Sequence, residues 1–192
     1  TTPAYFDRLT DWQRALYLSA YFGAEMSAPS AQHDKNLYCP KVSQNRERAV
    51  ADAGEQFMHE VADALNSLGI ETNTVERFEA DSRDGVERLR VGIKNDSENL
   101  IQFFSTVGYR YNEHKQQEAA AAMQYLKRKE HTIERRAEIA AEVATRADGG
   151  TPVSTLRAES DINDRFIERS AWSGRSGRPR PPADFPDYEE FR

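Results

Sequence analysis

Hydrophobic residues recur at helical spacing in several long stretches of the chain. Residues 11–25 and 46–68 place apolar side chains three and four positions apart, which predicts two amphipathic helices. Residues 96–107 and 115–147 are predicted as further helices, the second because strong helix formers dominate it. Residues 37–44 are predicted as extended chain between the first two helices.

The stretch "VERLRVGIK", by contrast, alternates apolar and polar positions with the period of a strand. One face carries Leu89, Val91 and Ile93, and the other carries Arg88, Arg90 and Lys94. The preceding stretch "IETNTVERF" is predicted as its partner strand, because a turn containing Asp84-Gly85 separates the two.

This order of helices and strand pairs predicts an α+β fold, an antiparallel sheet with helices on one face. The other sheet face would be open, and its arginines make it a candidate cradle for DNA. Three segments are expected: a domain over 1–129, a helical extension over 130–172 and a linker or tail over 173–192. Within the extension, residues 162–170 suggest the recognition helix of a helix-turn-helix, and a purely structural extension is the alternative.

Charge and composition narrow the setting of this fold. The net charge is −6, with 32 acidic and 26 basic residues, so any DNA binding must depend on local patches. The acid surplus and the preference for Arg over Lys suggest a halophilic source. Cys39 is the single cysteine and excludes an internal disulfide. The sequence has no signal-peptide pattern and no membrane-spanning run, so a cytoplasmic protein without a membrane partner is expected. Because the first residue is Thr1 and not methionine, a piece of a longer precursor or a trimmed chain is also expected.

The stretch "LSAYFGAEM", residues 18–26, ends a helix with a carboxylate, Glu25. An acid is unfavourable there because it faces the negative end of the helix dipole. The stretch resembles the LAGLIDADG motif of homing endonucleases, with Glu25 at the position of the metal-binding acid. Further along, "VSQN", "RVGIKNDSENL" and "NLIQFFSTVGYRYNEHK" resemble segments of the DOD-type endonucleases of archaeal inteins, over about residues 5–129.

The resemblance implies a LAGLIDADG αββαββα half-unit and a site-specific DNA endonuclease that uses Mg²⁺ to hydrolyse phosphodiester bonds. In that interpretation Glu25 binds the metal, and Lys94 and Gln44 position the attacking water and complete the catalytic set. The residues expected to contact double-stranded DNA are Arg88, Arg90, Arg46, Arg48 and Lys41.

Several features depart from the motif and keep alternatives open. Gly23 stands where the motif usually has an acid, and Met26 stands where it has glycine. Since one motif supplies one carboxylate, a second motif is expected from homodimerisation or from a missing N-terminal half. The alternatives are a non-catalytic DNA-binding regulator and a degenerate remnant on the same scaffold. The extension and tail also resemble those of inteins in archaeal RNA ligases, which suggests a host.

Overall fold

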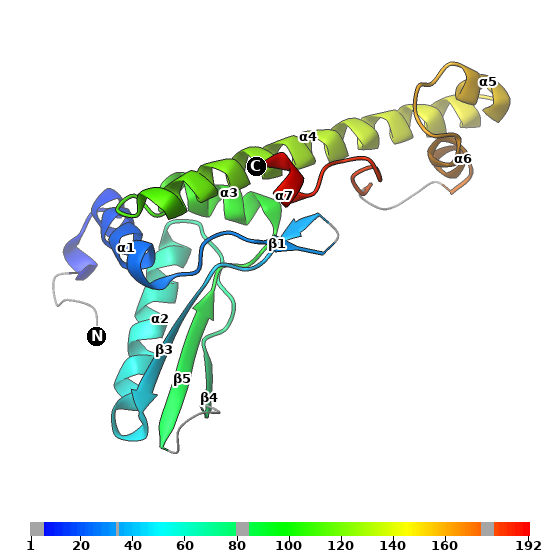
Figure 1. Cartoon of the computed structure of the whole chain (residues 1–192). Helices are drawn as coiled ribbons and strands as arrows, with labels where there is room; N and C mark the ends of the chain where they lie inside the picture. Colours follow the sequence, from blue (N-terminus) through cyan, green and yellow to red (C-terminus); the bar gives the residue numbers. More distant parts are fainter. Residues whose placement is uncertain (1–5, 34, 80–84, 174–178) are drawn as a thin grey trace. The chain divides into compact units, whose positions relative to one another are not determined.

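The computed structural model describes residues 6–33, 35–79, 85–173 and 179–192, which form an α+β chain (Figure 1). Its elements, in chain order, are η1 (Phe6–Arg8), α1 (Asp11–Glu25), β1 (Ala31–Gln32), β2 (Asn36–Leu37), β3 (Lys41–Glu47), η2 (Arg48–Val50), α2 (Ala51–Ser67), β4 (Glu76–Glu79), β5 (Val86–Gly92), α3 (Ser97–Thr106), α4 (Glu113–Asp148), α5 (Val153–Ala158), α6 (Asp164–Ser173) and α7 (Tyr188–Phe191).

The chain divides into two compact units. One comprises the residues up to Lys127 together with Pro186–Arg192, and the other comprises Arg128–Phe185. The predicted tail over 173–192 includes α7, in which Tyr188 donates a 3.0 Å hydrogen bond to the carbonyl of Glu118 on α4. Residues 186–192 therefore pack as part of the first unit.

Helix α1 starts and ends as the sequence predicted. Thr10 and Gln13 form a capping box at its N-terminus, which satisfies backbone groups that the first helical turn leaves unpaired. At the other end, Met26 takes an extended conformation and stops the helix directly after Glu25. Leu18 and Phe22 are fully buried on the inner side of the helix.

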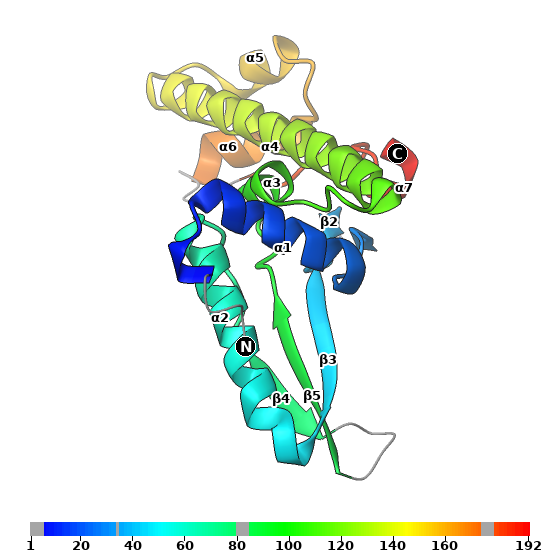
Figure 2. The same cartoon turned by 90° about the vertical axis from the view of Figure 1, so that its left-hand side faces the viewer.

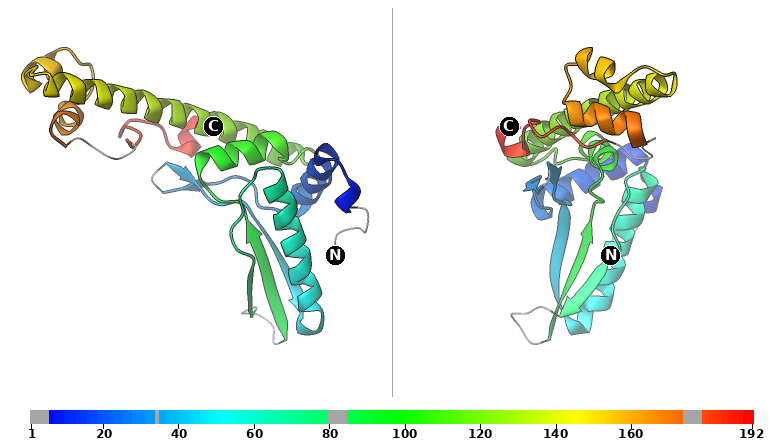
Figure 3. Two further views of the ribbon diagram at one scale, coloured as in Figure 1. Left: turned by 180° about the vertical axis from the view of Figure 1, so that it is seen from behind. Right: turned by 90° about the vertical axis from the view of Figure 1, so that its right-hand side faces the viewer.

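The main sheet has the strand order β3-β5-β4, and both pairings are antiparallel. The predicted alternation in β5 is confirmed: Leu89 and Val91 are buried, and Arg88 and Arg90 are partly exposed. Figures 2 and 3 show α2 running along one side of this sheet. The apolar side chains of β5 therefore lie between the sheet and α2.

The boundaries of neighbouring elements differ from the sequence predictions. Arg46 and Glu47 belong to β3, and α2 starts only at Ala51, because the pairing of β3 with β5 continues to Glu47. Strands β1 (Ala31–Gln32) and β2 (Asn36–Leu37) form a separate two-stranded sheet. Asp84 of the predicted turn lies outside the described residues, and the LAGLIDADG half-unit stays a prediction.

Aromatic side chains connect α1 to α3 in the core of the first unit. The ring centroids of Phe22 and Phe103 are 5.8 Å apart, and Tyr109 contacts Phe103 edge-on at 5.8 Å. Burial raises the pKa of the Tyr109 hydroxyl, which donates a 2.9 Å hydrogen bond to the carbonyl of Ser27. This cluster fixes the segment that follows α1.

The second unit has its own small core. Val143 of α4, Leu156 of α5 and Ile167 of α6 are buried together, and Ile139 and Phe166 are among the partly buried residues that pack on them. Figure 1 shows α5 and α6 beside the C-terminal part of α4, which belongs to the same unit. The predicted extension over 130–172 thus contains two short helices, α5 and α6, and the helix-turn-helix function stays a prediction.

No helix in the described part of the chain combines the length and the apolar character required to cross a bilayer, α4 included.

Candidate nucleic-acid interface

The side of the main sheet opposite α2, which we call the open face, is polar. Because side chains of a strand alternate between the two faces, the residues that point away from α2 can be assigned from the buried ones. They are Lys41, Ser43, Asn45 and Glu47 of β3, Val86, Arg88 and Arg90 of β5, and Glu76 and Phe78 of β4.

Two arginines occupy the centre of the open face, on the middle strand. Arg88 lies opposite Asn45 and Arg90 lies opposite Ser43 in the pairing of β5 with β3. The Nε of Arg88 donates to Asn45 Oδ1 at 3.2 Å, and the Nε of Arg90 donates to Ser43 Oγ at 3.3 Å. Each side chain thus uses its Nε for a hydrogen bond to β3, and the other guanidinium nitrogens are not engaged by that strand.

Strand β4 supports the same two arginines from the other side. Their guanidinium carbons lie 5.8 Å (Arg88) and 5.1 Å (Arg90) from the ring centroid of Phe78. Glu76 approaches Arg90 at 3.5 Å. Arg88, in contrast, forms no ion pair within the described residues. At its centre the open face therefore has an orientated cation that no carboxylate of the described residues compensates.

The side of the sheet that packs on α2, which we call the closed face, contains arginines whose charge is compensated. Arg77 contacts Asp52 at 2.7 Å, Glu55 at 2.8 Å and Glu87 at 2.6 Å. These carboxylates raise the pKa of its guanidinium, led by the hydrogen bonds from Glu55 and Asp52. Arg48 contacts Glu79 at 2.5 Å and Glu87 at 3.2 Å. Arg48, predicted to contact DNA, is therefore part of an ion-pair network.

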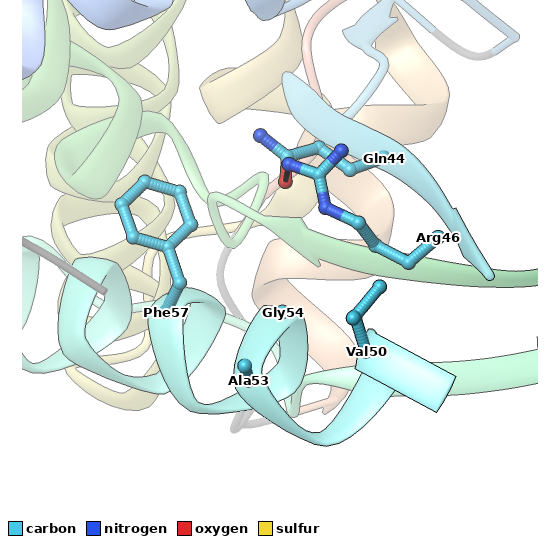
Figure 4. Close-up of a pocket in the computed structure, with 6 residues that line it drawn as sticks. All are labelled: Gln44, Arg46, Val50, Ala53, Gly54 and Phe57. Atoms are coloured by element: carbon cyan, nitrogen blue, oxygen red, sulfur yellow. Dashed lines mark hydrogen bonds between the residues drawn. The ribbon is translucent and has the colours of Figure 1, made fainter. Parts of the chain in front are cut away.

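Arg46 also lies on the closed face and not beside Arg88. Its Nη2 donates to Gln44 Oε1 at 2.7 Å, and Gln44 Nε2 donates to the Tyr21 hydroxyl oxygen at 2.7 Å. Figure 4 shows the head groups of Gln44 and Arg46 over α2, with Phe57 beyond them. These side chains line a hollow of about 360 Å³ together with Val50, Ala53 and Gly54. The predicted DNA contacts are thus divided between the two faces: Arg88, Arg90 and Lys41 on one, Arg46 and Arg48 on the other.

Two of the predicted catalytic residues, Gln44 and Lys94, each interact with a different partner. Gln44 binds Tyr21, and Lys94 forms a 2.5 Å ion pair with Glu71. The hydrogen bond and charge of each partner raise the pKa of Lys94 and lower that of Glu71. Within the described residues no hydrogen bond or ion pair joins Glu25 to Lys94 or to Gln44.

Lys115 of α4 explains how α1 tolerates an acid at its C-terminus. Its ammonium group donates to the carbonyls of Gly23 at 2.9 Å, Ala24 at 3.3 Å and Met26 at 2.8 Å. A cation on these carbonyls compensates the negative end of the helix dipole, which Glu25 would otherwise aggravate. Glu25 itself is exposed, and its charge, second to burial, raises the pKa of Tyr21.

The small residues of α1 have a structural use within this chain. Ser19 Oγ accepts the backbone N–H of Arg110 at 2.7 Å, and Asn112 Nδ2 donates to the carbonyl of Gly23 at 2.9 Å. A Cβ on Gly23 would lie 3.4 Å from that of Asn112. The close approach of residues 110–112 thus accounts for two of the small positions that suggested a LAGLIDADG motif.

No cluster of three or more His, Cys, Asp or Glu residues in the described part of the chain could hold a metal ion. Glu25 as a Mg²⁺ ligand therefore stays a prediction, as do double-stranded DNA and a second motif as partners.

The sequence reasoning missed three contributors to the open face: Ser43, Asn45 and Phe78. Their signal was the alternation along β3 and β4 once the strand register is known. It also missed Lys115, whose long-range contact with α1 leaves no signature in a local pattern.

Comparisons with known proteins find two relatives that are both named tRNA-splicing ligase RtcB. It is 32% identical over 188 residues to the tRNA-splicing ligase RtcB of Methanopyrus kandleri, an alignment that covers 94% of this chain and 18% of that protein. It is 26% identical over 183 residues to the tRNA-splicing ligase RtcB of Pyrococcus furiosus, again covering 94% and 18%. No family model matches the chain. No solved structure matches it significantly.

These names contradict the sequence prediction of an intein-associated LAGLIDADG homing endonuclease that cleaves DNA, because the relatives are named as ligases of RNA. The prediction depended on a nine-residue motif in one copy and on three further segments that resemble DOD-type endonucleases. Short motifs of small residues recur wherever backbones pack closely. The host suggested by the extension and tail, an archaeal RNA ligase that carries an intein, stays a prediction. The chain spans about a fifth of the length of the relatives it matches, 18% in both cases.

Proposed function

We propose that this chain is a nucleic-acid-binding segment of an RNA-joining enzyme, and that its open face holds the sugar-phosphate backbone of RNA. The observation that carries the proposal is Arg88, a guanidinium orientated by Asn45 and left without a carboxylate partner in the described part of the chain. Arg90 and Lys41 extend the positive charge along the same face.

The chemistry of the open face favours phosphate over bases as the group bound. Arginine donors in a fixed fork suit phosphate oxygens, and Ser43 and Asn45 add neutral hydrogen-bonding groups. Phe78 is the aromatic ring of this face, but Arg88 and Arg90 already lie near its ring. A base has little room to stack there, so we infer a backbone contact of low sequence specificity.

RNA is the proposed ligand because the two relatives are named tRNA-splicing ligases. The bond-forming step is not assigned to any residue of this chain, which aligns with less than a fifth of those proteins. The net charge of −6 does not oppose the proposal, since a local patch determines binding at short range.

The test is a titration of a fluorescein-labelled RNA stem-loop with the full chain, followed by anisotropy at several salt concentrations. Arg88→Gln and Arg90→Gln should each weaken binding about 3- to 10-fold and each reduce the salt slope by about 1, as expected for loss of one phosphate contact.

Arg46→Gln is the matched control, because it removes the same charge from the closed face, at the residue directly after Asn45 in β3. It should leave RNA affinity unchanged. Equal affinity of wild type and Arg88→Gln would overturn the assignment of the open face. Tighter binding of a matched DNA duplex than of the RNA would overturn the choice of ligand.

A further inference from the structure

Helix α6 in the second unit packs one face against the core and exposes the opposite face. Ile167 and Ser170 are buried, and Phe166 and Ala171 pack against the same cluster. The opposite side carries Arg165, Arg169 and Trp172, spaced four and three residues apart, so the three side chains share one helix face. We call them the outer α6 face.

Trp172 is the most exposed large hydrophobic side chain in the described part of the chain, with 78% of its surface accessible. A tryptophan so exposed adds little to folding, because the hydrophobic gain depends on the area removed from water. It lies one helical turn from Arg169. An exposed aromatic ring beside guanidinium groups is therefore available to a ligand.

The two acids of α6 are engaged by the neighbouring helix α5. Asp164 and Glu168 both contact the guanidinium of Arg157 on α5, the second at 3.0 Å. Their negative charges are thus compensated from the neighbouring helix, and they oppose an approaching anion less than the sequence suggested. Between residues 165 and 180 the sequence holds five arginines and one acid, in a chain whose net charge is −6.

We propose that the outer α6 face binds single-stranded nucleic acid, with Arg165 on a phosphate and Trp172 stacked on a base. An acidic peptide would satisfy the guanidinium groups but would not use the flat exposed ring. One exposed apolar side chain is too little surface to bind a membrane. A single strand offers both phosphates and uncovered bases, and stacking on an aromatic ring tolerates any base. This site is separate from the open face and does not depend on it.

The experiment uses the full chain with Trp12→Phe, which leaves Trp172 as the sole tryptophan, since the chain has 2. Addition of an oligouridine RNA should quench its emission in a saturable manner, because the base stacks on the indole. Trp172→Leu should weaken binding about tenfold and Arg165→Gln about threefold, whereas Trp172→Phe should bind nearly as wild type.

Two control variants and two other polyanions test whether the outer α6 face is the binding site. Arg135→Gln removes an exposed charge of α4 and should not change affinity. The double variant Arg88→Gln, Arg90→Gln should retain the quenching of Trp172, which separates this site from the proposed RNA-binding face. Absence of quenching by oligouridine, or equal quenching by inorganic polyphosphate or by polyglutamate, would overturn it. Because Arg165 and Trp172 are exposed, their variants should keep the wild-type circular dichroism spectrum.

Discussion

The two faces of the β3-β5-β4 sheet both contain arginines but use them differently. On the closed face, Arg77 and Arg48 share Glu87, and other carboxylates complete their contacts. On the open face, Arg88 is held by a neutral amide and an aromatic ring. The same residue type therefore serves packing on one side and is available for recognition on the other. Strand register, which decides the face, separates the two roles.

The largest loss of folding stability is expected from a substitution on the closed face at Glu87, which forms ion pairs with two arginines. Its side chain is 12% exposed, and Glu87→Gln leaves both guanidinium groups without their shared carboxylate. We expect the free energy of unfolding to fall by about 2 kcal/mol, less than for a fully buried pair because each arginine keeps another partner. Urea denaturation measures it.

Glu47→Gln is the control for that experiment. It removes an exposed carboxylate from the open-face side of β3 and should change the free energy of unfolding by less than about 0.5 kcal/mol. Equal effects of the two substitutions would erase the proposed distinction between the faces.

A smaller effect is expected from Gly54→Ala, which tests how closely α2 approaches the closed face. A Cβ at this position would lie 2.5 Å from Leu89 Cδ1 and 3.1 Å from Arg46 Cγ. Overpacking of this kind costs about 1–3 kcal/mol, and the better helix propensity of alanine returns up to about 1 kcal/mol. A net loss of about 1 kcal/mol is therefore expected in thermal or urea unfolding.

Ala53→Gly calibrates the propensity contribution, since Ala53 is exposed on the same helical turn. A stabilising Gly54→Ala would mean that α2 and β5 are farther apart than the structure indicates, and would weaken the description of the closed face.

The smallest effect concerns Lys94, which the sequence grouped with the open-face arginines but which pairs with Glu71. The hydrogen bond and charge of Lys94 hold the pKa of Glu71 below its ordinary value of 4.5. A carboxyl group with a lowered folded-state pKa contributes stability above its unfolded pKa, and that contribution is lost as the pH falls through the folded pKa.

Glu71→Gln should therefore reduce stability slightly at pH 7 and less at pH 3, as measured by urea midpoints at the two values. Asp63→Asn, an exposed carboxylate on α2 with no ion pair among the described residues, should show no such pH dependence. A Glu71→Gln difference that persists unchanged at low pH would show that the pair is not its cause.

Local patterns in the sequence were sufficient to predict where most helices and strands form. The capping of α1 at Thr10, the alternation of Leu89 and Val91 with Arg88 and Arg90, and the long helix α4 all depend on residues close in the chain. The start of α2 was misplaced because pairing with β5 keeps Arg46 and Glu47 in a strand, which is a long-range effect.

The candidate site was predicted only in part, and the function was not. Arg88 and Arg90 were found because their alternation with buried residues is visible locally. Arg46 and Arg48 were assigned to the same surface because nothing local shows on which face a strand residue lies before its register is known. The nine-residue motif around Glu25 suggested an endonuclease, although Ser19 and Gly23 are small for contacts made with residues 110–112.

The sequence alone determined where helices and strands form, that the chain is an α+β protein rich in charge, and which residues could carry charge or metal. These depend on backbone propensity and on the period of apolar positions, both local properties. The tertiary structure alone decided which arginines are compensated, that Lys115 supports the acidic end of α1, and that Arg157 compensates the acids beneath the outer α6 face. Those outcomes depend on which distant residues meet, and a charge acts through its neighbours in space.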